Sequence, residues 1–247
     1  MTTVLGYALA LLIGLLLGLL GGGGSILTVP VLHYVLGYDV KAAIPMSLVI
    51  VGLTSGFGVA NHWRARAVNW RAALSFGPPA VVGSILGAEL GLKVEPGVQL
   101  TVFALIMLAA AVSMLLPRPA VEADVVRPRP LPLISLIGAA VGVLTGFVGV
   151  GGGFLYVPAL VVLGGLTMKQ AIGTSLVLIM LSCIAAVARY HGNTVFDWRA
   201  IFIFTALAFV GVAAGSRLVP HVSQQVLRKG FAVFLLAVGA LVLLRGR

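Results

Sequence analysis

The stretch LLGGGGSILTVPVL, residues 19–32, interrupts an apolar segment with four consecutive glycines, and a similar stretch, FVGVGGGFLYVPAL, returns at residues 147–160. A glycine in a helix interior costs about 1 kcal/mol relative to alanine. Irregular backbone within a bilayer is tolerated only where protein buries it or where it lines a wet cavity. Two glycine runs at matching places therefore predict two broken helices that form a paired central site.

Composition identifies the solvent as lipid. Of the 247 residues, 60% are hydrophobic and only 9% are charged, whereas soluble domains carry roughly 25% charged residues. A soluble core cannot use this much apolar surface, so we expect an integral membrane protein. The first apolar segment, Val4–Leu20, lacks a basic region before it and a small-residue cleavage site after it, so we expect it to be retained in the membrane.

Charge and motif content exclude several other classes. The net charge of +10 comes from Lys and Arg residues clustered between apolar runs, where they act as topology signals and contact anionic headgroups rather than nucleic acid. The single cysteine, Cys183, excludes an internal disulfide and any multi-cysteine metal site. The chain has no ATP-binding phosphate loop and no dinucleotide motif. We expect no enzymatic activity, no cofactor and no metal.

Ten apolar runs fall into two series of five. They lie at about 4–20, 26–36, 42–61, 72–91 and 98–116, and then at 132–148, 154–164, 171–188, 200–216 and 230–244. Between the series stands PRPAVEADVVRPRP, residues 117–130, whose four prolines and five charges predict an extended linker.

The two series are related by a constant shift along the chain, which we call the repeat offset. The shift that pairs Pro30 with Pro158 also pairs the sequence Trp-Arg-Ala at 70–72 with the same sequence at 198–200. Composition bias alone does not produce such matches. We therefore predict two homologous transmembrane repeats, residues 1–116 and 132–247, joined by a linker at 117–131. Duplicated halves are typical of secondary transporters, in which the substrate site lies where the halves meet.

The short runs leave two topologies open. Eleven residues make about 16 Å of helix, too little to cross a core of about 30 Å. If the chain reverses at the glycines, each half holds a re-entrant hairpin and three crossings, and the halves are inverted. If it continues straight on, each half has four crossings and the halves are parallel. Both topologies place ten Lys and Arg residues on one face and six on the other. We favour inversion because a glycine run more readily forms a reversal than a kink, and because inverted repeats are common in transporters.

A helix begins after each glycine run, and its first N–H groups and positive dipole end favour an anion. Ser25, Thr28 and Tyr156 would add hydroxyl donors. The candidate anion-binding residues of the two runs are Gly22, Gly23, Gly24, Ser25, Gly151, Gly152 and Gly153. The alternative is that the glycines only permit close helix packing. Packing is the interpretation we prefer for the isolated glycines Gly83, Gly87, Gly211 and Gly215.

A second pair of motifs supports a polar site. AAIPMSL, residues 42–48, aligns with QAIGTSL, residues 170–176. Because a Pro or Gly followed by a small hydroxyl residue loosens the first turn of a helix, we expect Ser47, Thr174 and Ser175 to complete the site as donors.

Ionisable groups are scarce. The six carboxylates all lie near segment ends or in loops, whereas proton and cation pathways usually show ionisable groups within the membrane. A neutral site of N–H and O–H donors suits an anion better than a cation. His33 is either a proton carrier or a residue with an interfacial or packing role. Arg189 either reaches an anion or extends towards the membrane surface.

Three motifs together resemble the TauE/SafE family, described as sulfite exporters and organosulfonate permeases. They are the glycine runs followed by Pro (GGGGSILTVP and GVGGGFLYVP), the sequence AIGTSL at 171–176 and the loop GNTVFDW at 192–198. The resemblance covers nearly the whole chain outside the linker. The first half departs from the pattern, with Pro45-Met46 in place of Gly-Thr and Asn69 in place of Asp.

The resemblance implies an all-α, multi-pass protein of a bacterial or archaeal inner membrane. Its expected function is secondary transport of sulfite or an organosulfonate such as sulfoacetate, by export or sometimes uptake. Its partners would be the anion and the bilayer, and a homodimer is compatible with this hypothesis. A channel-like pore for small anions or neutral solutes is the alternative.

Overall fold

The computed structural model describes residues 2–20, 23–64, 66–115, 131–149, 153–162, 164–190, 196–218 and 224–245. Every regular element in these ranges is a helix. The predicted linker, residues 117–131, lies outside them except for Leu131.

The helices follow the apolar runs closely. The first half contains α1 (Thr2–Leu20), η1 (Gly23–Leu27), α2 (Thr28–Pro30), η2 (Val31–Val35), α3 (Val40–Arg64), α4 (Trp70–Lys93) and α5 (Pro96–Leu115). The second half contains α6 (Leu131–Val148), α7 (Gly153–Val162), α8 (Met168–Tyr190), α9 (Trp198–Leu218) and α10 (Gln224–Arg245). Four helices are long and apolar enough to cross a membrane, namely α3, α4, α9 and residues 169–190 of α8. The described chain is therefore that of a multi-pass helical membrane protein.

Two helices do not break where the sequence suggested. α3 runs without interruption through Pro45, and α8 runs through Gly173, because the two helices begin well before these residues, at Val40 and Met168. Pro45 lies within the first two turns, so its missing N–H removes only one hydrogen bond near the helix end. The predicted loosening next to Ser47 and Thr174 is absent from these two helices.

Glycines on α1 allow its backbone to approach α9 closely. A Cβ at Gly14 would overlap the carbonyl oxygen of Ala208, and one at Gly18 would overlap that of Val212. Residue numbers rise together along this contact, so α1 and α9 run parallel.

The same contact recurs between α6 and α4. A Cβ at Gly142 would overlap the carbonyl oxygen of Ala80, and one at Gly146 would overlap that of Ser84. The repeat offset relates all four residues to their counterparts in the α1–α9 contact. The first helix of each half, α1 or α6, therefore packs against a later helix of the other half, α9 or α4.

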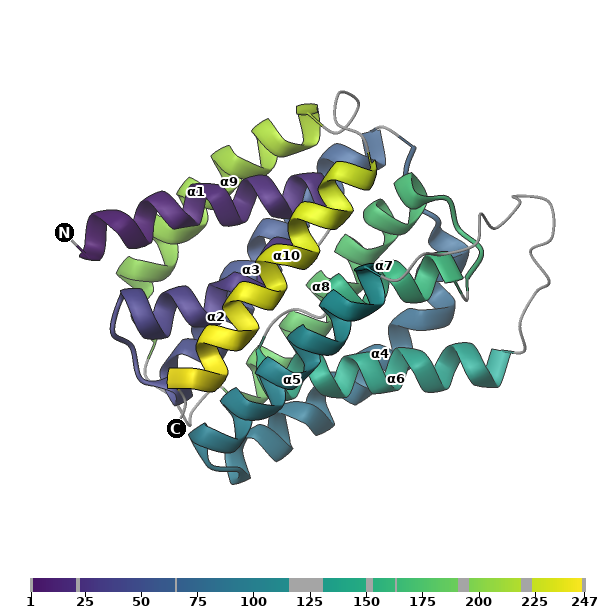
Figure 1. Ribbon diagram of the computed structural model, residues 1–247. Coiled ribbons are helices and arrows are strands. Elements are labelled where there is room, and N and C mark those ends of the chain that lie inside the picture. The colour runs from purple at the N-terminus through teal and green to yellow at the C-terminus, as the bar shows by residue number, and fades with distance from the viewer. Residues whose placement is uncertain are drawn as a thin grey trace.

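The central pair of helices runs antiparallel. Gly52, Gly56 and Gly58 of α3 lie against Cys183, Met180 and Leu176 of α8, so residue numbers rise along one helix as they fall along the other. α3 also packs on α9, and α8 packs on α4. The α1–α9 and α4–α6 pairs accordingly lie on opposite sides of α3 and α8, while α5 and α10 lie side by side (Figure 1).

The chain turns back after α1. Gly24 lies against Ile13 and Leu17, and Leu36 lies against Gly6 near the beginning of α1. Residues 24–36 therefore return along α1 in the opposite direction.

Candidate functional site

The segments that follow the two glycine runs contact each other. Gly23 begins η1, Gly153 begins α7, and η1 packs against α7. Gly24 and Ser25 are buried, and Gly24 packs on the backbone of α1. The predicted site residues Gly22, Gly151 and Gly152 lie outside the described residues.

Ser47 ties the second glycine break to α3. Gly149 follows α6 with a φ of 76°, a conformation that glycine adopts without strain, and it packs against Ile44. The hydroxyl of Ser47 donates to the carbonyl oxygens of Gly149 and Ile44, the latter at 2.9 Å. Ser47 therefore links a residue of the first half to the glycine break of the second.

The other two hydroxyl residues of this motif also bond to backbone. Ser175 is fully buried and donates to the carbonyl of Ile172 at 2.8 Å, which repeats the bond from Ser47 to Ile44. Thr174 is fully buried, and its Oγ1 accepts a hydrogen bond of 2.9 Å from the backbone N–H of Asn69. Thr174 therefore lies against the loop between α3 and α4.

Tyr156 is fully buried on the first turn of α7. Its hydroxyl forms a 2.9 Å hydrogen bond with Ser182 in the middle of α8. The sequence indicated Tyr156 as a hydroxyl donor but not its partner Ser182, because a single hydroxyl in an otherwise apolar run has no distinguishing pattern.

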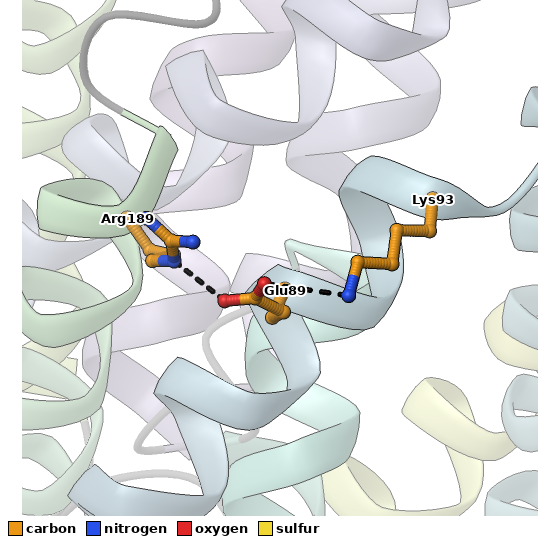
Figure 2. A network of polar contacts seen from close by, with 3 residues as sticks. All are labelled: Glu89, Lys93 and Arg189. Carbon is orange, nitrogen blue, oxygen red and sulfur yellow. Dashed lines mark hydrogen bonds and ion pairs between the residues drawn. The ribbon is translucent and has the colours of Figure 1, made fainter.

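His33 and Arg189 bond to groups outside the predicted anion site. The Nδ1 of His33 donates to the carbonyl of Tyr38 at 2.8 Å, after the short helical segment that contains His33. The Nε of Arg189 donates to Glu89 of α4 at 2.7 Å, and Lys93 lies 3.4 Å from the same carboxylate (Figure 2). Arg189, at the end of α8, thus forms an ion pair with Glu89 of α4.

Three buried hydroxyls lack a hydrogen-bond partner among the described residues. They are those of Thr28, at the start of α2, Ser55, in the middle of α3, and Thr205, in α9. An unsatisfied buried polar group costs about 1–3 kcal/mol, and such groups in native proteins call for an unseen partner. These hydroxyls are therefore candidates for contact with a ligand or with water.

The sequence signals for these three differ. Thr28 follows the first glycine run and aligns with Tyr156 at the repeat offset. Ser55 and Thr205 align with Cys183 and Gly77, so comparison of the halves reveals neither. Their importance depends on burial, which only the folded chain defines.

The described carboxylates lie at helix ends or in loops, and no group of three metal-ligating side chains occurs among the described residues. Asp197 caps α9 by accepting from the N–H of Ala200 at 3.0 Å, and it also accepts from the hydroxyl of Tyr38 at 2.6 Å. The Tyr38 hydrogen bond is the main cause that holds the pKa of Asp197 below its usual value. Burial, with a smaller effect from Asp197, raises the pKa of Tyr38 to about 12.

Known proteins resemble this chain along most of its length. Residues 6–242 match the family described as sulfite exporter TauE/SafE. A probable membrane transporter protein of Xylella fastidiosa is 32% identical over 241 residues, which is 95% of this chain and 92% of that protein. The probable membrane transporter protein YjnA of Bacillus subtilis is 28% identical over 257 residues, covering 94% and 96% of the two chains. A probable membrane transporter protein of Methanocaldococcus jannaschii is 26% identical over 194 residues, covering 74% and 71%.

No solved structure matches the chain. The family match covers far more than half of the chain, and the relatives share its length and carry transporter names. The chain therefore belongs to the sulfite exporter TauE/SafE family of membrane transporters.

Proposed function

We propose that this protein is a secondary transporter that exports a small sulfur-containing anion, sulfite or an organosulfonate such as sulfoacetate. The substrate binds between the two halves, and alternating access exposes it to each side in turn. The family match supports the substrate class. The observation that carries the proposal is the set of buried hydroxyls of Thr28, Ser55 and Thr205, which have no partner among the described residues and lie on α2, α3 and α9, with α3 packed against both of the other helices.

The chemistry of the site suits an oxyanion. Hydroxyls and backbone N–H groups donate hydrogen bonds, and the first turn of α7 has N–H groups without a partner inside the helix. An anion would exchange its hydration for these donors. The predicted glycines Gly22, Gly23, Gly24, Gly151, Gly152 and Gly153 would supply backbone donors, and Ser25 and Thr174 would supply hydroxyls. Ser47 and Ser175 would donate to the anion only after releasing their carbonyl partners.

We also propose that residues 1–116 and 132–247 are inverted repeats. Two observations support the inverted arrangement. Helix contacts recur at the repeat offset, and α3 contacts α8 in an antiparallel direction. A two-fold axis that relates antiparallel helices is perpendicular to them, and therefore lies in the membrane plane. The return of residues 24–36 along α1 supports a re-entrant hairpin, which the offset assigns to α6 and α7 as well.

Hydroxyl removal tests the site. Thr28→Val and Ser55→Ala each delete a buried oxygen that has no described partner, so we expect the melting temperature without ligand to stay constant or to rise. Sulfite and sulfoacetate should raise the melting temperature of the parent protein in detergent. That shift should fall by half or more in both variants, because one donor to the anion is lost. Chloride and sulfate serve as comparison anions.

Ser84→Ala is the matched control, because its buried hydroxyl donates to the carbonyl of Val81 in its own helix at 2.8 Å. It should leave the anion-induced shift unchanged. Saturable counterflow of labelled sulfite in proteoliposomes would distinguish a carrier from a pore. If no sulfur-containing anion stabilises the folded parent and no counterflow occurs, the proposed function is wrong.

A further inference from the structure

Two links between side chains, each with a carboxylate as the acceptor, join the halves at one end of the molecule. The hydroxyl of Tyr38, in the first half, donates to Asp197 of the second half at 2.6 Å. The Nε of Arg189, in the second half, donates to Glu89 of the first half at 2.7 Å (Figure 2). Figure 2 also shows that Glu89 lies between Arg189 and Lys93, so that its carboxylate has a cation on either side.

Other contacts establish that both links lie at the same end. The Nζ of Lys41, at the start of α3, donates to the carbonyl of Gly91 near the end of α4 at 2.7 Å. Gly91 also lies against the hydroxyl of Tyr190, the last residue of α8. Tyr38 directly precedes α3. We call this the Tyr38 end, comprising residues 38–41, 89–94, 189–190 and 197.

The opposite end has a different chemistry. There, the end of α3 and residues 66–69 meet the first turns of α8, where Gly173 packs on Ala67 and Asn69 donates its N–H to Thr174. We call this the Asn69 end. Among the described residues, the hydrogen bond from the N–H of Asn69 to the hydroxyl of Thr174 joins the halves at this end, and neither of its groups is charged.

The repeat offset gives the counterparts of both links. Tyr38 and Asp197 correspond to Leu166 and Asn69, and Leu166 has no hydroxyl to donate. Glu89 and Arg189 correspond to Arg217 and Asn61, which cannot form an ion pair. The sequence therefore restricts both links to one end of an otherwise symmetric arrangement.

We propose that the Tyr38–Asp197 and Glu89–Arg189 links form a gate that holds the Tyr38 end closed, so that the protein opens more readily at the Asn69 end. This inference rests on the proposed function, because it assigns a gate to the alternating access of that site. Hydrogen bonds that involve an ionised partner are roughly twice as strong as neutral ones, and both links of the gate include a carboxylate. Opening the Tyr38 end moves the start of α9 away from the start of α3 and the end of α4 away from the end of α8, and so breaks both links. Opening the Asn69 end leaves both intact.

Thiol labelling tests the gate without any substrate. In a Cys183→Ala background, Ser47→Cys places a thiol beneath the Tyr38 end, and Ser175→Cys places the matching thiol beneath the Asn69 end. Both serines are fully buried, and they occupy equivalent positions about two turns inside α3 and α8. The probe is a charged methanethiosulfonate reagent, and the reading is the labelling rate of purified protein in detergent.

The Tyr38→Phe/Glu89→Gln double variant should raise the labelling rate of the Ser47→Cys thiol about threefold or more, because one link loses its donor and the other loses its negative charge. It should not raise the labelling rate of the Ser175→Cys thiol. Lys93→Gln is the matched control, since it removes a partner of Glu89 within α4 but leaves both links between the halves. It should leave both rates unchanged.

Two further results keep the test decisive. Melting temperatures identify variants that have lost their fold. Exchange of the charged pair, Glu89→Arg with Arg189→Glu, should return the labelling rate of the Ser47→Cys thiol towards that of the parent. Equal labelling rates in the folded double variant and the parent would overturn the gate. Because no anion takes part, this result would leave the sulfite proposal standing, and a failure of sulfite binding would leave the labelling result valid.

Discussion

Asp197 and Asn69, which occupy equivalent positions in the two halves, share a local role, and Asp197 adds a long-range one because its half faces Tyr38 where the other has Leu166. Both residues precede Trp-Arg-Ala, and both cap a helix by accepting from the N–H three residues later. This is the usual function of Asp and Asn at a helix start. Only Asp197 also binds Tyr38 of the other half, through its second carboxylate oxygen.

Tyr38→Phe should change the acid sensitivity of the protein. The folded pKa of Asp197 lies below its usual value, mainly because of the Tyr38 hydrogen bond. Asp197 therefore contributes stability at pH values above its unfolded pKa, and this contribution is lost as the pH falls through the folded pKa. In Tyr38→Phe the folded pKa rises towards the usual value of about 3.9. The melting temperature should thus be lower than that of the parent at neutral pH, and the difference should disappear in acid.

Asp197→Asn serves as the comparison for this measurement. Asn retains the helix cap, as Asn69 does in the first half, but carries no titrating group. The melting temperature of this variant should respond equally to pH with Tyr38 or Phe at position 38. A constant difference between the parent and Tyr38→Phe across the whole pH range would contradict the assigned role of Tyr38.

At the scale of elements, glycines determine which helices pair. Gly83 and Gly87 bring α4 against α6, and Gly211 and Gly215 bring α9 against α1. In lipid, helices gain little from apolar contact as such, so small residues that permit close backbone packing decide the association. The four-residue spacing in the sequence predicted packing surfaces of this kind, but it did not identify their partners.

Gly87→Ala should destabilise the protein, because its Cβ would overlap the carbonyl oxygen of Val143. Forcing extra volume into a packed contact costs about 1–3 kcal/mol. Gly230→Ala is the matched control in α10, where no atom lies within 4 Å of the added Cβ. Thermal unfolding in detergent should show a lower melting temperature for Gly87→Ala and an equal or higher one for Gly230→Ala. Equal shifts in both variants would mean that the α4–α6 contact is not limiting.

At the scale of the whole molecule, the proposed inverted topology assigns each loop to a face. This topology would put ten of the 16 Lys and Arg residues at the Asn69 end and six at the Tyr38 end. Cytoplasmic loops carry the excess of positive charge. The Asn69 end is therefore expected to face the cytoplasm, and the gate at the Tyr38 end would close the outer face. A resting protein that opens inwards is suited to load an anion for export.

This topology predicts that both termini lie outside the cytoplasm. A C-terminal alkaline phosphatase fusion, active only outside the cytoplasm, should show activity, whereas a green fluorescent protein fusion at the same place should stay dark. Insertion of either reporter into the segment that joins α5 to α6 should give the opposite pattern. Fluorescence from the C-terminal fusion would reverse the assigned orientation.

By itself, the sequence determined the membrane class, the succession of helices and the family. These depend on composition, on the lengths of apolar runs and on motifs such as GNTVFDW, which are local properties of the chain. That the hydroxyls of Ser47, Thr174 and Ser175 complete an anion site stays a prediction, since the structure shows them bonded to backbone groups. The prediction of loosening next to Pro45 was wrong, because α3 begins at Val40 and Pro45 falls within its first two turns, where the missing N–H removes only one hydrogen bond.

Only the tertiary structure decided which groups meet. The bond from Ser47 to Gly149 spans 102 residues, that from Tyr38 to Asp197 spans 159, and that from Arg189 to Glu89 spans 100. No spacing rule within one helix links such positions, because the contacts arise when helices from different halves pack together. The unpartnered hydroxyls of Ser55 and Thr205 are likewise defined by burial. A hydroxyl in a helical sequence indicates a binding site only when the fold buries it without a hydrogen-bond partner, and the sequence does not show that burial.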